Sequence, residues 1–129
     1  MKRVTGIGGI FFKAQDPEEM YQWYEKHLGI QREPGSPAAV LHWREAGDPQ
    51  RPGMTAWALF EKETKYFDPS RAPFMINYRV DDLDALLEAL RAEGVEIDPK
   101  REDYDYGSFA WIMDPEGNRI ELWEPPKAK

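Results

Sequence analysis

The amino-acid sequence predicts an α+β fold in which a unit of one strand, one helix and three further strands occurs twice in tandem. Three observations carry this prediction. Helix-start signals occur at Asp16 and again at Asp82, and each helical stretch ends at a glycine. A strand-like apolar run precedes each helix, at residues 7–13 and 74–80. A Pro-rich connector at residues 68–73 separates the two halves.

The two halves are expected to form one domain. A chain of 129 residues suffices for one substantial core but not for two independent cores. The single domain covers residues 1–129, with unit one at about residues 4–67 and unit two at about residues 73–125. Because internal duplication dictates architecture, we predict two βαβββ units in tandem.

The first helix has clear signals at both ends. Asp16 is a suitable N-cap, Pro17 suits the first helical position, and Glu19 can reach back as in a capping box. Gly29 is a natural stop after the helix. The apolar positions near helical spacing are Met20, Trp23, Tyr24 and Leu28. Further strands are predicted near residues 30–33, 38–44 and 55–61, with Pro/Gly-rich segments at 34–37 and 47–53.

The second half repeats this order. Asp81 or Asp82 caps a helix that ends at Gly94, and its leucines recur at i, i+3, i+4 and i+7. These leucines are Leu83, Leu86, Leu87 and Leu90. We therefore expect two equivalent core helices. Further strands are predicted near residues 95–97, 108–113 and 119–124.

The last strand follows a tight turn, Asp-Pro-Glu-Gly-Asn, that begins at Asp114. Proline presets a negative φ, glycine accepts a positive φ, and the Asp and Asn side chains bond the turn backbone. Strand alternation then places Ile120 and Leu122 on one face, in the core, and Glu121 and Trp123 on the other face. A carboxylate and a tryptophan therefore share a face.

Composition excludes several classes of function. The net charge of −7, with no basic stripe, argues against nucleic-acid binding. The absence of cysteine excludes disulfides, thiolate metal sites and a cysteine nucleophile. No apolar run approaches the roughly 18 residues of a membrane span, and no apolar signal sequence opens the chain. We therefore expect a cytoplasmic protein with neither nucleic acid nor membrane as a partner.

The duplicated pattern, the two helix-ending glycines and the run from Asp114 to Leu122 together resemble the vicinal-oxygen-chelate superfamily. This superfamily includes glyoxalase I, extradiol dioxygenases, fosfomycin-resistance enzymes and bleomycin-resistance proteins. The resemblance covers roughly residues 5–125 and is best in the second half, from Tyr78 to Asp84 and at Gly94. It implies a glyoxalase-like fold, with curved mixed sheets around a cavity, and a homodimer.

The resemblance also implies a divalent metal, held by His or Gln on the first strand of each unit and by Glu or His on a last strand. The first-strand positions fall on Gly9, which has no side chain, and on Met75, whose thioether suits such metals poorly. The last-strand position of unit two falls on Glu121, which matches. In unit one it falls around residues 58–60, unless the register is shifted to a nearby glutamate. Because a metal needs about three protein ligands, we expect no cofactor, with a divalent metal as the alternative.

The two histidines have structural and functional interpretations. His27 lies near the end of the first helix, where its positive charge favours the helix dipole. His42 lies in a predicted strand beside Trp43, and either faces outward or lines the cavity as a ligand contact.

Strand alternation predicts the lining of the cavity. On the first strand, Ile10 and Phe12 are expected to pack on the helix while their neighbours face the cavity. Arg79 either clamps a ligand carboxylate or phosphate or pairs with Glu121. Glu121 is the candidate catalytic residue, as a general base if apolar neighbours raise its pKa. The predicted ligand-binding residues are Phe11, Lys13, His42, Met75, Asn77, Arg79, Tyr106, Trp111 and Trp123.

The tyrosine-rich stretch at residues 103–107 is expected either to form the cavity rim or to be plain surface or a dimer contact. Three functions follow as alternatives. The first is a metal-free, bleomycin-resistance-like protein that binds a small organic molecule. The second is a metal-dependent lyase or isomerase of the glyoxalase type that uses Glu121. The third is a non-catalytic dimerisation or regulatory module, for which a filled cavity would be the sign.

Overall fold

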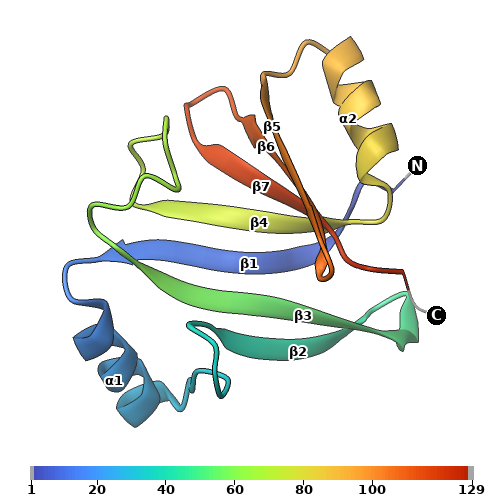
Figure 1. The fold of residues 1–129 in the computed structure, drawn as a ribbon. Helices are drawn as coiled ribbons and strands as arrows, with labels where there is room; N and C mark the ends of the chain where they lie inside the picture. The colour runs from blue at the N-terminus through green and yellow to red at the C-terminus, as the bar shows by residue number, and fades with distance from the viewer. Residues whose placement is uncertain (1, 128–129) are drawn as a thin grey trace.

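The computed structural model describes residues 2–127, which form two helices and seven strands (Figure 1). In each unit, the helix follows the first strand along the chain. In chain order the elements are β1 (Val4–Ala14), α1 (Pro17–Leu28), β2 (Ala39–Glu45), β3 (Asp48–Glu61), β4 (Phe74–Val80), α2 (Leu83–Ala92), β5 (Ile97–Tyr104), β6 (Gly107–Met113) and β7 (Arg119–Glu124).

All seven strands join one curved, open, mixed sheet in the order β2-β3-β1-β4-β7-β6-β5 (Figure 1). The first strands of the two units, β1 and β4, pair antiparallel at its centre. Each of them also pairs in parallel with the last strand of its own unit, β1 with β3 and β4 with β7. The predicted α+β class is therefore confirmed. The two units share one continuous sheet.

One predicted strand of unit one is wrong. Residues 30–33 contribute only an isolated bridge between Arg32 and Ala39. Pro34 and Pro37 follow, and because proline has no N–H to donate, a regular ladder cannot continue through them. Unit one is therefore βαββ, whereas unit two is βαβββ.

Two predicted loops are shorter than expected. β3 begins at Asp48, inside the Pro/Gly-rich segment, and β5 begins at Ile97 and continues to Tyr104. β1 pairs only with residues 56–61 of β3, so the prolines at the start of β3 have no neighbour on that side. Proline is tolerated at such an unpaired strand edge. The stretch 103–107 is thus the tip of the β5–β6 hairpin.

Both helices begin at the predicted aspartates. Asp16 Oδ1 accepts a hydrogen bond from the Glu19 N–H (3.1 Å), and Asp82 Oδ1 accepts one from the Ala85 N–H (3.0 Å). Each cap satisfies an N–H that has no partner within its helix. The matching caps confirm that the two units begin their helices in the same way.

The two helices bury different amounts of apolar surface. In α2 all four predicted leucines are buried, and they pack with Val80 and Leu122. In α1 the buried residue is Tyr21, whereas Trp23 and Leu28 are 51% and 60% exposed. The expectation of equivalent core helices was wrong, because α1 turns its Tyr21 side toward the sheet and leaves Trp23 outside.

An apolar stripe lies between the helices on the face of the sheet that carries them. Phe12 packs in the cluster beneath α1, and its partner across the β1–β4 pair is Phe74. Ile10 is exposed on this face, so the prediction that it packs on the helix was wrong. The stripe consists of Val4, Ile7, Ile10 and Phe74. No helix within residues 2–127 has the length and apolarity needed to cross a membrane.

Candidate functional site

Glu121 lies on the face of the sheet opposite the helices, as the alternation along β7 predicts. The register of the sheet places it beside Asn77 of β4 and Trp111 of β6. The residue is only 2% exposed. Its carboxylate accepts hydrogen bonds from Asn77 Nδ2 (2.6 Å), from Trp111 Nε1 (3.0 Å) and from the Tyr66 hydroxyl. The carboxylate is therefore fully engaged with side chains of its own chain.

Burial dominates the electrostatics of this carboxylate. Removal from water raises the pKa of Glu121, and the three hydrogen bonds and the positive charge of Arg119 only partly oppose that rise. Burial and the neighbouring carboxylate also raise the pKa of Tyr66 above its ordinary value. Tyr66 is thus a neutral phenol that donates to Glu121.

The centre of the face around Glu121 is filled by the protein itself. Phe67, Met75 and Trp111 are completely buried there, and Phe11 packs against them. The Lys13 amine lies 5.5 Å from the centroid of the Phe67 ring. Four residues predicted to line a cavity therefore lie in or around a filled centre. They are Phe11, Lys13, Met75 and Asn77.

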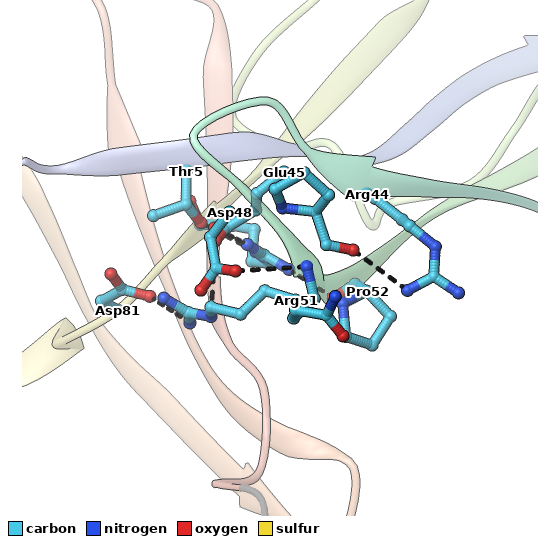
Figure 2. Close-up of polar contacts among 10 residues, drawn as sticks. Thr5, Arg44, Glu45, Asp48, Arg51, Pro52 and Asp81 are labelled. Carbon is cyan, nitrogen blue, oxygen red and sulfur yellow. Dashed lines mark hydrogen bonds and ion pairs between the residues drawn. The ribbon is translucent and has the colours of Figure 1, made fainter.

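Arg79 does not pair with Glu121, which was one of the two alternatives that the sequence left open for it. Its Nε donates to Thr5 Oγ1 (2.7 Å) and its Nη1 to the Pro52 carbonyl (3.2 Å). Its Nη2 forms an ion pair with Glu45, which is labelled in Figure 2. The guanidinium also lies 4.9 Å from the Trp43 ring centroid. Alternation along β4 put Arg79 on the expected face, but the β2–β3 hairpin supplied a nearer carboxylate.

Arg51 extends this network to a second carboxylate. Its Nε lies 3.4 Å from Glu45, and its Nη2 donates to Asp81 (2.9 Å; Figure 2). Arginines and acids therefore alternate along the network, each unit supplies one of each, and their charges balance.

An open cleft with a volume of about 720 Å³ lies next to this network. The β2–β3 hairpin forms one wall, and the end of β7 with the residues that follow it forms the other. Four of the predicted ligand-binding residues meet here: His42, Arg79, Tyr106 and Trp123. Trp123 Nε1 donates to the Tyr106 carbonyl (2.9 Å), which fixes the indole in the wall.

A second hollow, of about 440 Å³, lies on the other side of the β5–β6 hairpin tip. Tyr104 and Tyr106 stack on one another at this tip, with ring centroids 5.0 Å apart. Tyr106 lines both the cleft and the hollow, so the tip forms their shared rim. The residues that line the hollow are Tyr66, Lys100, Glu102, Tyr104, Tyr106, Phe109 and Trp111.

The residues around Glu121 do not fit a divalent metal. Every partner of its carboxylate is a hydrogen-bond donor, whereas a cation requires acceptors. A side chain at Gly9 would begin 2.5 Å from the Phe11 ring, so that position is closed, and Met75 is packed in the apolar centre. Residues 2–127 contain no group of three His, Asp or Glu side chains arranged to hold a metal.

Sequence reasoning missed the two residues that decide the site, Tyr66 and Glu45. Tyr66 lies between β3 and β4, in a stretch with no periodic pattern. Glu45 ends β2, and alternation alone does not show that it turns toward Arg79. Each acts through a partner that is distant in sequence. Only the adjacent aromatic residues Tyr66 and Phe67 after β3 could have pointed to this position.

Solved structures similar to this chain include several epimerases. Methylmalonyl-CoA epimerase from Mycobacterium tuberculosis is 22% identical, with a TM-score of 0.58, over 98% of this chain and 92% of that one. A variant of Streptomyces coelicolor methylmalonyl-CoA epimerase in complex with 2-nitronate-propionyl-CoA is 16% identical, with a TM-score of 0.67, over 98% of both chains. A protein described as NAD-dependent benzaldehyde dehydrogenase from Legionella pneumophila is 16% identical, with a TM-score of 0.58, over 92% of this chain and 98% of that one.

At these identities the similarity establishes the fold alone, and one fold hosts many activities. No curated protein matches the chain in sequence. The family model described as Glyoxalase/Bleomycin resistance protein/Dioxygenase superfamily matches residues 6–122, which is nearly the whole chain. The chain therefore belongs to the Glyoxalase/Bleomycin resistance protein/Dioxygenase superfamily.

Proposed function

We propose that this protein binds a small organic molecule, without a metal, in the cleft between the β2–β3 hairpin and the end of β7. The cleft itself carries the proposal. Its volume of about 720 Å³ lies within the range of small-molecule sites, which are concave and largely apolar with few polar groups. Its apolar lining consists of Pro52, Met54, Val80, Tyr106, Trp123, Pro125 and Pro126.

The charges of the cleft indicate what the ligand carries. Arg79 and Arg51 are balanced by acids, and Glu124 accepts from the Leu83 N–H (2.7 Å) at the start of α2. In the described part of the chain, His42 and Lys127 have neither a hydrogen bond nor an ion pair from their side chains, and both line the cleft. The apolar lining favours an apolar ligand, and these two groups favour one that carries a carboxylate or another acceptor.

A catalytic role for Glu121 has less support. A general base must reach the proton that it removes, and this carboxylate is enclosed by three donors and a filled apolar centre. The metal-dependent lyase or isomerase alternative also needs ligands that the surroundings of Glu121 do not supply. The chemistry of the similar epimerases therefore provides no support for a reaction at Glu121.

The binding proposal is tested by titrating 2-naphthoate into protein purified without chelator and following tryptophan fluorescence. The wild type should bind the compound, and Trp123→Phe and His42→Ala should each weaken binding about 10-fold or more. Trp23→Phe is the matched control, because Trp23 is exposed on α1. Binding that ignores both cleft variants, or that disappears when a stoichiometric metal is removed, would contradict the proposal.

The filled centre favours a second candidate function, a non-catalytic dimerisation or regulatory module. The apolar stripe on the helix-bearing face supplies a surface for a homodimer, because exposed contiguous apolar groups commonly mark interfaces. Light scattering should give a dimeric mass for the wild type and a monomeric mass for Ile10→Lys. Leu41→Lys, at an exposed position on the edge strand β2, is the control and should remain dimeric. A monomeric wild type at micromolar concentration would rule out this dimer.

A further inference from the structure

Tyr66 occupies an aromatic box that ends at the buried carboxylate. Its ring stacks on Phe60, with centroids 5.5 Å apart and planes 9° from parallel, and meets Trp111 edge-on at 6.3 Å. Its hydroxyl donates to Glu121. A phenol in this position thus has rings to pack against and a carboxylate to accept the hydrogen bond from its hydroxyl. These are the interactions by which a protein recognises a small phenol.

The segment that carries Tyr66 is attached to the sheet by few hydrogen bonds and by the packing of Phe67, which is buried with Met75 and Trp111. We name residues 62–72, the yellow-green connection between β3 and β4 in Figure 1, the strap. Its backbone hydrogen bonds are local, such as Asp68 N–H to Lys65 C=O (3.0 Å) and Ser70 N–H to Phe67 C=O (2.9 Å). Apart from the Thr64 N–H, which donates to Glu61 C=O at the end of β3 (3.0 Å), the described residues form a single hydrogen bond between the strap and the strands, from Tyr66 to Glu121.

An open space adjoins the box on the side where Tyr66 could leave it. Tyr66 forms one wall of the hollow of about 440 Å³, and Trp111 forms another. The Tyr66 ring can therefore move into the hollow while Phe60 and Trp111 stay on their strands. The walls of the box belong to paired strands, whereas its occupant belongs to a locally bonded strap.

We propose that the box is a ligand site for a small phenol, which the chain's own Tyr66 occupies when no ligand is bound. The ligand enters from the hollow, stacks on Phe60 and donates its hydroxyl to Glu121 in place of Tyr66. This site is separate from the cleft at Trp123, and its existence does not depend on the function proposed for that cleft.

The chemistry of the box defines the ligand class. Asn77 and Trp111 already donate to the carboxylate, so the vacancy left by Tyr66 requires one more donor. A carboxylate ligand would place two negative groups together, and a ring without a hydroxyl would leave the acceptor unmatched. A site built to bind a hydroxyl rejects an analogue that lacks it. Competition with Tyr66 lowers the apparent affinity in proportion to the fraction of open protein.

The test is calorimetric titration of 4-methylphenol, the side chain of tyrosine, into the wild type and a set of variants at pH 7. Wild type should bind it weakly. Tyr66→Phe, which removes the hydrogen bond of the strap, should bind it about 10-fold more tightly, and Tyr66→Ala more tightly still. Glu121→Gln made in Tyr66→Ala, where no phenol of the chain competes, should bind it less tightly than Tyr66→Ala alone. Toluene, which lacks the hydroxyl, should bind Tyr66→Ala at least about 10-fold more weakly than 4-methylphenol.

Three outcomes would overturn the proposal. The first is equal affinity of the wild type and Tyr66→Phe for 4-methylphenol. The second is equal affinity of Tyr66→Ala for toluene and 4-methylphenol. The third is no binding of 4-methylphenol to the wild type at any accessible concentration. Tyr66→Phe keeps the ring that fills the box, so the comparison stands even if Tyr66→Ala fails to fold. His42→Ala should leave this titration unchanged, which separates the box from the cleft. Failure of 2-naphthoate to bind the cleft would leave the result for the box intact.

Discussion

The carboxylate of Glu121 accepts hydrogen bonds from three side chains, and a Glu121→Ala substitution leaves all three donors without their acceptor. Asn77 and Trp111 are 3% and 0% exposed, so water cannot replace the lost partner at either. Tyr66 borders the open hollow, and its hydroxyl can become hydrated there. The cost therefore comes mainly from two buried donors.

The magnitude follows from the cost of a buried donor without a partner, about 1–3 kcal/mol each. Two such donors give a loss of about 2–6 kcal/mol in the free energy of unfolding. The cavity left by the deleted atoms adds to this loss. Because a domain of this size is stable by only about 5–15 kcal/mol, Glu121→Ala should be close to unfolding.

Glu121→Gln is the matched control, because glutamine keeps the shape and one acceptor oxygen. That oxygen can accept from Tyr66 and Trp111, which both bond Oε2 of the carboxylate. Asn77 Oδ1 is buried without a partner, and turning the Asn77 amide places it against the new glutamine N–H. We expect a stability within about 1 kcal/mol of the wild type.

The assay is urea unfolding at pH 7, followed by circular dichroism and tryptophan fluorescence for the three proteins. The midpoint should fall steeply for Glu121→Ala and stay near that of the wild type for Glu121→Gln, with a common slope. A loss below 1 kcal/mol for Glu121→Ala, or equal losses for both variants, would refute the reasoning. Either result would mean that the carboxylate is not the acceptor that holds these side chains.

Three further predictions concern pH, the ion-pair network and a glycine. Folding raises the pKa of Glu121 above its ordinary 4.5, so the stability that its protonated form contributes is present below pH 4.5 and lost as the pH rises through the raised value. The unfolding free energy of the wild type minus that of Glu121→Gln should therefore fall from pH 4.5 upward and then level off, and a rising difference in urea titrations would contradict this. Glu45→Ala leaves Arg79, which is 4% exposed, without its acidic partner, and should lower the free energy of unfolding by about 3–5 kcal/mol in thermal or urea unfolding. An unchanged stability would mean that solvent compensates the charge, and would contradict the prediction. Gly8→Ala places a Cβ 2.3 Å from Asn77 Oδ1 and should cost about 1–3 kcal/mol, whereas Gly47→Ala, with no atom within 4 Å, should be neutral by the same assay.

Much of the fold could be predicted because its signals are local. A cap joins residues three apart, as in the Asp16 and Asp82 caps, and the leucine spacing of α2 reports one face of one helix. Strand alternation likewise depends only on backbone geometry, which is why Glu121 was assigned to the correct face. The prediction failed where a local signal was absent, as at the bridge of Arg32 or the outward side of Trp23.

The sequence by itself determined the two units, their helix boundaries and the residues that share each face of the sheet. Only the tertiary structure decided which partner each buried charge finds. Glu121 bonds Tyr66 from 55 positions away, and Arg79 pairs with Glu45 from 34 positions away. No periodicity specifies such pairs, because they depend on how the β2–β3 hairpin and the strap fold back over the sheet. The same folding fills the centre around Glu121 and leaves the cleft at Trp123 open.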